Sequence, residues 1–365
     1  MSTGKRVRLA VVGAGVIGNV HGAVAVELAD RIELAAFVDT TRERAEKLAS
    51  TYGGKAFTSL ADALAEVDLD VVAVCTPTGE HGAVAIEALE AGKHVIVEKP
   101  AETTVTKTDE IIAAQKRAGT QVTVISQHRF DPATEVAVEA IAKGELGRLT
   151  SGVASIDWWR GQSYYDSGDW RGTWALDGGG ALMNQGVHTV DLLVALMGRP
   201  VEVFAYTGTL AHERIEVEDV AVGVVKFESG ALGVLHATTA AYPGLSARVQ
   251  AHGDRGSVIV DSDKLSFIHR TQSDSDAAER SYGGGKDTIN QVADYPEASG
   301  TAGPTAGADP GAMENIAHRR QYENFLDALA GTAEIRVTLE TNRQAISIIT
   351  GVYESARSGQ PVRLG

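Results

Sequence analysis

The feature that most constrains this chain is a glycine-rich turn between a predicted strand and a predicted helix. Val7–Val12 is a candidate strand, and Gly13-Ala14-Gly15-Val16-Ile17-Gly18 follows it directly, before a segment rich in Ala, Val and Leu. In such a turn Gly13 permits a tight bend, Gly15 lets the backbone approach a pyrophosphate, and Gly18 allows close helix packing. Phosphates are then expected at the helix N-terminus. The pattern predicts a dinucleotide-binding unit.

A second predicted strand supports this interpretation. Ile32–Val38 ends in Asp39, at roughly the spacing expected for the acid that binds the ribose hydroxyls. A carboxylate there also repels a 2′-phosphate, so NAD is favoured as the cofactor, although Arg42 and Arg44 nearby keep NADP open. The structural alternative for Asp39 is an N-cap of the following helix.

Helical and apolar segments alternate as far as Ser126, which predicts a doubly wound parallel α/β sheet of the Rossmann type. The run His94–Pro100 lacks amphipathic spacing, so it predicts a strand that is buried on both faces. Pro100 cannot extend a central ladder, and the strand is expected to stop at Lys99. Lys99 would then lie at the carboxyl edge of the sheet, where ligands bind. Thr76 and Pro77 end the preceding strand and are expected beside the cofactor.

The alternation is lost in the second half of the chain. The segment 201–260 is strand-like, with hairpin turns at 227–232 and 253–257, and predicts a large, mostly antiparallel open-faced sheet in an α+β domain. We therefore predict a domain at 1–126 for NAD(P) and a domain at 127–365 for substrate binding and oligomerisation. An open sheet face predicts a homodimer or homotetramer. The segment 271–313 has little periodicity and predicts a mobile loop.

Two stretches in the second half are candidates for substrate recognition. The loop 161–171 combines aromatic side chains with Asp and Arg, a composition that suits a sugar but equally an interface. The glycines at 178–180 begin a predicted helix on which Asn184, His188 and Asp191 are spaced by four and three residues, hence on one face. Substrate hydroxyls would supply partners for this polar face, whereas the alternative for His188 is a core hydrogen bond.

Composition excludes several classes of protein. The formal net charge is -15 and the 33 basic residues are scattered, so a nucleic-acid partner is not expected. The one cysteine, Cys75, lies in an apolar strand and predicts an inert buried thiol. No apolar run is long enough to span a membrane, and the N-terminal segment does not match a secretory signal. We expect a soluble, cytoplasmic protein without a membrane partner.

Several motifs together resemble one known family. The glycine turn at 13–18, Glu98-Lys99-Pro100, the segment 178–191 and the closing segment 353–359 are similar to the Gfo/Idh/MocA oxidoreductases, which include inositol dehydrogenases and glucose-fructose oxidoreductase. The resemblance implies hydride transfer between NAD(H) or NADP(H) and a CH–OH carbon of a sugar, sugar derivative or cyclitol. It also implies that Lys99 is the catalytic lysine and His188 the catalytic histidine. Asn184 departs from the inositol dehydrogenase branch, which usually has Asp at this position.

The hypothesis for the chemistry is that His188 accepts the hydroxyl proton while Lys99 stabilises the oxyanion, although Lys99 is an alternative base. Asn184 would orient the substrate or His188, and Asp191 would partly substitute for the missing carboxylate. Two rival functions remain open: a non-catalytic NAD-binding sensor or scaffold, and an oxidoreductase that keeps its cofactor bound and passes hydride between two sugars. No metal is expected.

The expected cofactor contacts are Gly13, Gly15, Val16, Ile17, Gly18, Asp39, Thr76, Pro77, His81, Glu98, Lys99 and Gln127. The expected substrate contacts are Lys99, Arg129, Tyr165, Arg171, Asn184 and His188.

Overall fold

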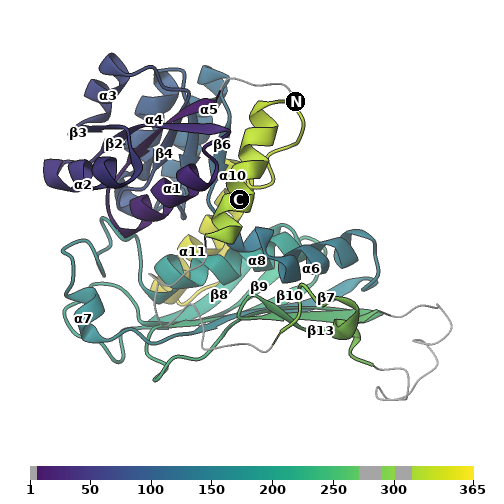
Figure 1. The fold of residues 1–365 in the computed structure, drawn as a ribbon. Helices are drawn as coiled ribbons and strands as arrows, with labels where there is room; N and C mark the ends of the chain where they lie inside the picture. Colours follow the sequence, from purple (N-terminus) through teal and green to yellow (C-terminus); the bar gives the residue numbers. More distant parts are fainter. Residues whose placement is uncertain (1–5, 271–288, 301–314) are drawn as a thin grey trace, which may run out of the picture. The chain divides into compact units, whose positions relative to one another are not determined.

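The computed structural model describes residues 6–270, 289–300 and 315–365, which form two compact units (Figure 1). The first unit is drawn from Met1–Gln127, Ala175–Gly178 and Met313–Ile346, and the second from His128–Trp174, Gly179–Ala312 and Ser347–Gly365. Each unit is described below by itself.

A six-stranded parallel sheet forms the centre of the first unit, in the order β3-β2-β1-β4-β5-β6. All of β4 and every residue of β5 except His94 are buried, as expected for a parallel sheet covered by helices on both faces. The strands are β1 (Val7–Val12), β2 (Ile32–Val38), β3 (Lys55–Phe57), β4 (Val71–Val74), β5 (His94–Val97) and β6 (Val122–Val124). The helices are α1 (Val16–Glu27), α2 (Arg42–Tyr52), α3 (Leu60–Glu66), α4 (His81–Glu90) and α5 (Val105–Ala118). The predicted Rossmann fold is confirmed.

The C-terminal helix α10 (Ile316–Leu329) also belongs to the first unit. Its residues Tyr322, Phe325 and Leu326 lie in the same apolar core as Leu9 and Val11 of β1. The sequence analysis assigned 127–365 to the second domain without interruption, and on this point the structure differs. Burial of the apolar face of α10 against the first sheet, rather than its position in the chain, decides where it packs.

An eight-stranded sheet forms the second unit, in the order β13-β12-β11-β7-β10-β9-β8-β14. Every neighbouring pair is antiparallel except β7 and β10, which are parallel. The predicted hairpins are present as β9–β10 and β11–β12. The strands are β7 (Leu149–Asp157), β8 (Pro200–Gly208), β9 (Val220–Phe227), β10 (Leu232–Thr238), β11 (Ala247–Gly253), β12 (Gly256–Asp261), β13 (Lys264–Arg270) and β14 (Val362–Arg363). The mostly antiparallel second sheet is thus confirmed.

Helices cover one face of this second sheet. They are α6 (Pro132–Ala142), α8 (Val187–Met197) and the C-terminal part of α11 (Leu339–Ser358), while α7 (Gln162–Tyr165) is a single turn in the aromatic loop (Figure 1). Helix α8 lies directly on the sheet, because a Cβ at Gly152 of β7 would meet Leu193 and Met197 at 2.8 to 3.0 Å. In the described part of the chain, no α-helix lies on the opposite face (Figure 1).

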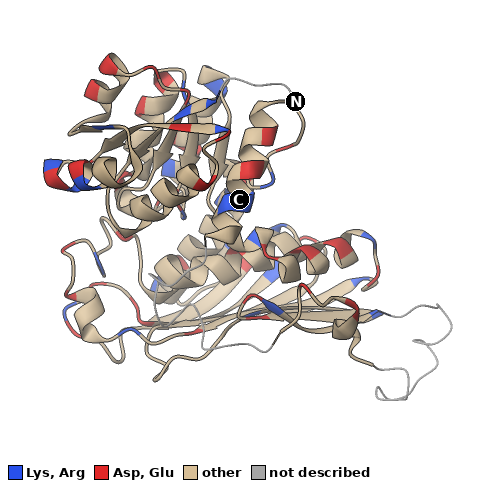
Figure 2. Cartoon of the chain, viewed as in Figure 1, with Lys and Arg blue, Asp and Glu red and all other residues tan. Residues whose placement is uncertain are grey.

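Two further sequence predictions concern the surface and the loop at 271–313. Figure 2 shows acidic and basic positions interspersed along the ribbon of both units. Among the described helices, none is both long enough and apolar enough to cross a membrane. Most of the predicted mobile loop, at 271–288 and 301–313, lies outside the described residues. Between these parts, η4 (Gln291–Asp294) is a short 3-10 helix.

Candidate active site

The glycine turn of the first unit has the geometry expected for a dinucleotide site. Gly13 has φ +101°, and a Cβ there would lie 2.4 Å from the carbonyl oxygen of Cys75. A Cβ at Gly18 would lie 2.0 Å from the carbonyl oxygen of Gly13, so both positions exclude side chains. At Gly15, in contrast, a Cβ would meet nothing within 4 Å. Gly15 caps α1 without a side-chain hydrogen bond, which leaves the first N–H groups of the helix for a phosphate.

Asp39 is held in place at the end of β2 by two backbone donors. Its Oδ2 accepts a hydrogen bond from the N–H of Ala14 at 2.9 Å, and its Oδ1 accepts one from Thr41 at 2.8 Å. The first bond links the carboxylate to the glycine turn. Thr41, and not Asp39, is the N-cap residue of α2. The carboxylate is therefore oriented beside the turn, as a ribose-binding acid requires.

Thr76 supplies a further observation that fits a bound cofactor. Its Oγ1 is buried and has no hydrogen-bond partner among the described residues. A buried hydroxyl without a partner is costly, and a bound ligand would satisfy it. Together with the open side of Gly15 and the uncapped start of α1, this hydroxyl fits an NAD molecule at the carboxyl edge of the sheet.

Lys99 follows β5 at that same edge of the sheet. The strand ends at Val97, two residues earlier than the sequence analysis predicted, although the N–H of Glu98 still bonds to the carbonyl of Val74 at 3.0 Å. Lys99 is half-buried, and its N–H donates to the Glu98 carboxylate at 3.1 Å. The Lys99–Pro100 peptide bond is cis.

His81 begins α4, and its side chain is buried between the turns that follow β4 and β5. It is 1 % exposed, and its two ring nitrogens lie 2.8 Å from the carbonyl oxygens of Pro100 and Thr76. Burial lowers the pKa of His81, so the ring is neutral and one nitrogen donates at a time. The sequence analysis predicted a cofactor contact here. In the structure the ring links the turns at 76–77 and 99–100, and the cofactor contact stays a prediction.

Glu98 is likewise buried, and it belongs to a polar cluster in the first unit. Its Oε1 lies 2.9 Å from His21 Nε2, and the other ring nitrogen of His21 lies 2.6 Å from the Tyr322 hydroxyl. His318 Nε2 lies 3.9 Å from the same carboxylate. Burial alone would raise the pKa of Glu98, but the hydrogen bond and charge of His21, with the charges of His318 and Lys99, lower it to about 2. Glu98 is therefore held as a carboxylate beside Lys99, and its contact with the cofactor stays a prediction.

The second unit carries the predicted polar helix. The segment η3 (Ala181–Gly186) is a π-helical turn, and α8 continues from it. Of residues 181–194, Asn184 and His188 are half-buried and all the others are buried. Asn184 Oδ1 accepts a hydrogen bond from Gln185 Nε2 at 3.0 Å. The chain thus brings two polar side chains to the accessible side of an otherwise buried helix, and π-turns are frequent at functional sites.

Glu218 anchors the start of this helix, and the sequence analysis did not identify it. Its carboxylate accepts hydrogen bonds from the N–H of Gly180 at 2.9 Å, from the N–H of Leu182 at 2.8 Å and from the Tyr353 hydroxyl at 3.0 Å. A Cβ at Gly180 would lie 1.7 Å from the carbonyl oxygen of Glu218, which explains the glycine. Burial outweighs these donors and raises the pKa of Glu218 to about 7.

Asp191 and Arg129 form an ion pair in the second unit. Arg129 Nε and Nη2 donate to the two carboxylate oxygens of Asp191 at 2.6 and 2.7 Å. From the sequence, Asp191 is expected to replace part of the missing carboxylate beside His188, and Arg129 is expected to contact substrate. The structure instead engages each of these groups with the other, which is the expected outcome for a carboxylate that is only 2 % exposed.

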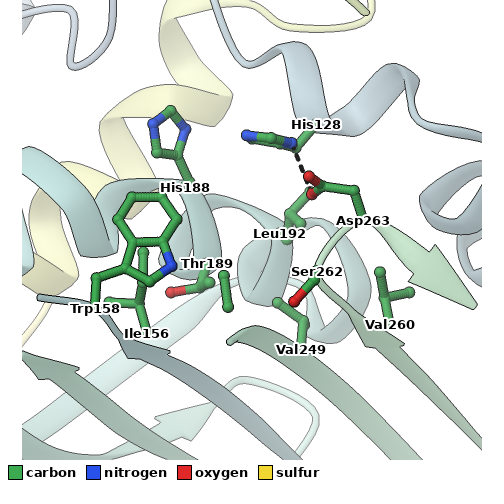
Figure 3. Close-up of a pocket in the computed structure, with 11 residues that line it drawn as sticks. His128, Ile156, Trp158, His188, Thr189, Leu192, Val249, Val260, Ser262 and Asp263 are labelled. Atoms are coloured by element: carbon green, nitrogen blue, oxygen red, sulfur yellow. Dashed lines mark ion pairs between the residues drawn. The ribbon is translucent and has the colours of Figure 1, made fainter. Parts of the chain in front are cut away.

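His128 lies beside His188 and is a second residue that the sequence analysis missed. The two rings are T-shaped, with centroids 5.0 Å apart (Figure 3). His128 Nδ1 lies 2.9 Å from a carboxylate oxygen of Asp131 and 2.9 Å from one of Asp263. Burial opposes the charged imidazolium, but the two carboxylates outweigh it and hold the pKa of His128 well above its usual range. The sequence feature that could have identified His128 is its position four residues after β6, the last strand of the parallel sheet.

Two adjacent tyrosines of the aromatic loop differ in burial. Tyr165 is buried, with its hydroxyl 2.8 Å from Thr239 Oγ1, so it stabilises the loop and has little surface for the predicted substrate contact. Tyr164 is half-buried, and its hydroxyl accepts a hydrogen bond from Gln185 at 3.2 Å. The guanidinium of Arg171 lies 4.3 Å from the centre of the Tyr164 ring. Tyr164, and not Tyr165, therefore connects this loop to the segment that carries Asn184.

The fold, the glycine turn and the oriented acid define a dinucleotide-binding oxidoreductase, and comparison with known proteins identifies its family. The model of the oxidoreductase family with an NAD-binding Rossmann fold matches residues 7–126, and that of the GFO/IDH/MocA C-terminal domain matches residues 134–259. The chain belongs to the Gfo/Idh/MocA family of NAD-binding oxidoreductases.

Three similar proteins illustrate the range of this family. The crystal structure of the WlbA dehydrogenase from Bordetella pertussis in complex with NADH and UDP-GlcNAcA is 30% identical, has a TM-score of 0.85, and is matched over 100% of this chain and 99% of that one. Myo-inositol 2-dehydrogenase from Thermotoga maritima is 28% identical over 286 residues, which are 75% of this chain and 80% of the relative. 1,5-Anhydro-D-fructose reductase from Ensifer adhaerens is 30% identical over 234 residues, 62% of this chain and 68% of the relative.

Proposed function

We propose that this oxidoreductase transfers hydride between NAD and a secondary alcohol or ketone of a sugar, a sugar derivative or a cyclitol. The observation that carries the proposal is the helix start at 181–194, where Asn184 and His188 are the two side chains that are not buried. The names of the similar proteins support a polyhydroxylated substrate, because they include an inositol dehydrogenase, an anhydrofructose reductase and a dehydrogenase bound to a nucleotide-linked sugar.

The chemistry follows from the side chains. His188 accepts the proton of the reacting hydroxyl, because a neutral imidazole is a base near neutral pH. Lys99 stabilises the negative charge that develops on the oxygen, as an ammonium group at a ligand edge is suited to do. Asn184 donates or accepts a hydrogen bond to orient a substrate hydroxyl. Asp39 and the glycine turn would hold NAD, which would supply the acceptor for the hydride of the carbinol carbon.

The test is the variant Lys99→Ala, assayed with NAD and a panel of inositols, aldoses and nucleotide-linked sugars at the absorbance of NADH. Loss of the ammonium should lower kcat by at least about 100-fold while the Kd for NAD, measured by calorimetry, stays within about twofold. Lys116→Ala is the matched control, since its side chain is 71 % exposed on α5. Turnover that survives in Lys99→Ala at the level of the control would refute the mechanism.

A further inference from the structure

A small cavity lies in the second unit between helix α8 and the sheet, and His188 forms part of its wall (Figure 3). Its volume of about 30 Å³ has room for roughly two water molecules. Side chains of α8, of strands β7, β11 and β12, and of the adjoining loops enclose it. Ile156, Leu192, Val249 and Val260 make much of this wall apolar.

Four polar groups interrupt the apolar wall and indicate that the cavity suits water. Trp158 Nε1 is buried without an acceptor among the described residues, and Figure 3 shows it on the cavity side of the ring. The hydroxyls of Thr189 and Ser262 already donate within the chain, so their oxygens can accept from a further donor. The carboxylate of Asp263 is another acceptor. One donor and three acceptors satisfy a buried water, which typically makes about three hydrogen bonds.

Asp263 connects this cavity with solvent. Its side chain is 40 % exposed, although it also forms part of the cavity wall. It lies in the turn between β12 and β13, where Ser262 and Asp263 have φ of +50° and +63°. Asp and Asn adopt this left-handed conformation more readily than other residues that carry a side chain. A carboxylate that reaches both the cavity and the bulk solvent can take a proton from one and release it to the other.

His128 keeps Asp263 in its ionised form. The Nδ1 of His128 lies 2.9 Å from a carboxylate oxygen of Asp263 and 2.9 Å from one of Asp131. These carboxylates hold the pKa of His128 well above its usual range, so its ring already carries a proton and is not an acceptor. Burial alone would raise the pKa of Asp263, but the charge and hydrogen bond of His128 lower it. Asp263 therefore holds an additional proton only briefly.

We propose that Asp263 carries the proton of the reaction from His188 to solvent, through a water molecule in this cavity. The inference rests on the proposed function, in which His188 takes the proton of the substrate hydroxyl as the carbon loses its hydride. An N–H bond of His188 then breaks and an O–H bond forms on the water, which gives one of its protons to the Asp263 carboxylate. Release of that proton to the bulk restores the neutral ring, the water and the ionised carboxylate. Both residues belong to the second unit.

The first test follows the proton directly. The full-length enzyme is mixed rapidly with NAD and the fastest substrate of the panel, and a single turnover is recorded by NADH absorbance and by a pH indicator in dilute buffer. In the wild type the two signals should rise together. In Asp263→Asn, which keeps a residue suited to the turn, release of the proton to the bulk should be at least about tenfold slower than NADH formation. Added formate, a small carboxylate, should raise the kcat of this variant and not that of the wild type.

The control for this test is Asp254→Asn. Asp254 lies in the turn between β11 and β12, and its side chain is 46 % exposed, so the proton and NADH signals should stay together. A proton signal that keeps pace with NADH in Asp263→Asn would overturn the relay and leave the proposed function standing. Absence of NADH formation with every member of the panel would instead refute the proposed function, and the relay with it.

The second test removes the water without changing a charge. Ala247 lines the cavity, and Ala247→Val would place two methyl groups in the space for water and should reproduce the slow proton release. Ala241→Val, half-buried in the same segment and outside the lining, is the control and should behave as the wild type. Proton release at the wild-type rate in Ala247→Val, with the water displaced, would contradict the relay.

NMR shows whether the water is present and whether Ala247→Val displaces it. The chain has four tryptophans, and Trp158→Phe identifies the Trp158 indole signal in a nitrogen–proton spectrum of the deuterated full-length protein. Magnetisation should pass from water to this signal in the wild type and not in Ala247→Val. A wild-type Trp158 signal that receives no magnetisation from water would overturn the proposal, whatever the activity of the enzyme.

Discussion

At the scale of single residues, the buried hydrogen bonds that join Tyr322, His21 and Glu98 should make the free energy of unfolding depend on pH in acid. The pKa of Glu98 is lowered from 4.5 to about 2, so the folded state favours the carboxylate. A depressed pKa contributes stability that is complete above the unfolded value and is lost as the pH falls through the folded value. The contribution of Glu98 should therefore disappear between pH 4.5 and pH 2. Its full size is about 3 kcal/mol.

The variant Glu98→Gln tests this expectation. At pH 7 it should be less stable than the wild type by up to about 3 kcal/mol in urea unfolding, and the difference should shrink as the pH approaches 2. Glu90→Gln is the control, because its side chain is 65 % exposed and its ion pair with Arg117 is long, at 3.9 Å. A stability difference between Glu98→Gln and the wild type that is constant from pH 7 to pH 2 would show that the charge of Glu98 has no such role.

The residue scale also shows what spacing and composition alone do not reveal. Spacing placed Asp191 on the face of His188, but it carries no information about Arg129, which is 62 positions earlier and takes the carboxylate. Composition favoured Tyr165 for substrate contact, whereas burial selects Tyr164 for the accessible position. Which of two adjacent side chains faces a site depends on the local path of the backbone, and this loop has no periodicity from which to predict it.

At the scale of secondary-structure elements, Glu218 controls the start of the helix that carries Asn184 and His188. The pKa of Glu218 is raised from 4.5 to about 7 by burial. For an acid with a raised folded pKa, the linked stability is fully present below pH 4.5 and is lost as the pH rises through 7. We expect Glu218→Gln to remove this dependence, so that the stability of the wild type relative to the variant falls by about 3 kcal/mol from pH 4.5 to pH 8.

Activity provides a second measurement on the same variant. The new side chain in Glu218→Gln would direct an amide N–H₂ toward the donors of Gly180 or Leu182, which loosens the helix start and should lower kcat about tenfold while the Kd for NAD is unchanged. Glu228→Gln, an exposed partner of Arg199, should change neither quantity. A wild-type kcat in Glu218→Gln would contradict a positioning role.

The elements themselves were largely predictable, for a physical reason. The glycine turn, the parallel strands and the two hairpins depend on patterns within about ten residues, and each of them is present. The helix start was less predictable, because the i, i+4 rule assumes an α-helix and residues 181–186 form a π-turn. Glu218 lies 38 positions from Gly180 in the sequence, and no periodic pattern links the two residues. The hydrogen bond by which Glu218 holds the helix start was therefore not predicted.

At the scale of the whole molecule, the uncovered face of the second sheet carries apolar side chains. Val222 and Val224 of β9, Leu232 and Val234 of β10 and Tyr206 of β8 are between 42 and 64 % exposed. They are neighbours in the sheet, because Tyr206 pairs with Val222 and Val224 pairs with Val234. A contiguous apolar patch on a sheet face is characteristic of an interface.

We therefore expect copies of the chain to associate through this face as a homodimer or homotetramer. Light scattering coupled to gel filtration should give a mass of two or four chains for the wild type, and Val224→Asp with Val234→Asp should reduce it to one, because two charges per copy would be buried without partners. Val26→Asp on α1, 48 % exposed in the first unit, is the control and should leave the mass unchanged. A monomeric wild type, or a double variant that keeps the wild-type mass, would exclude this face, and the exposed valines would then need another partner.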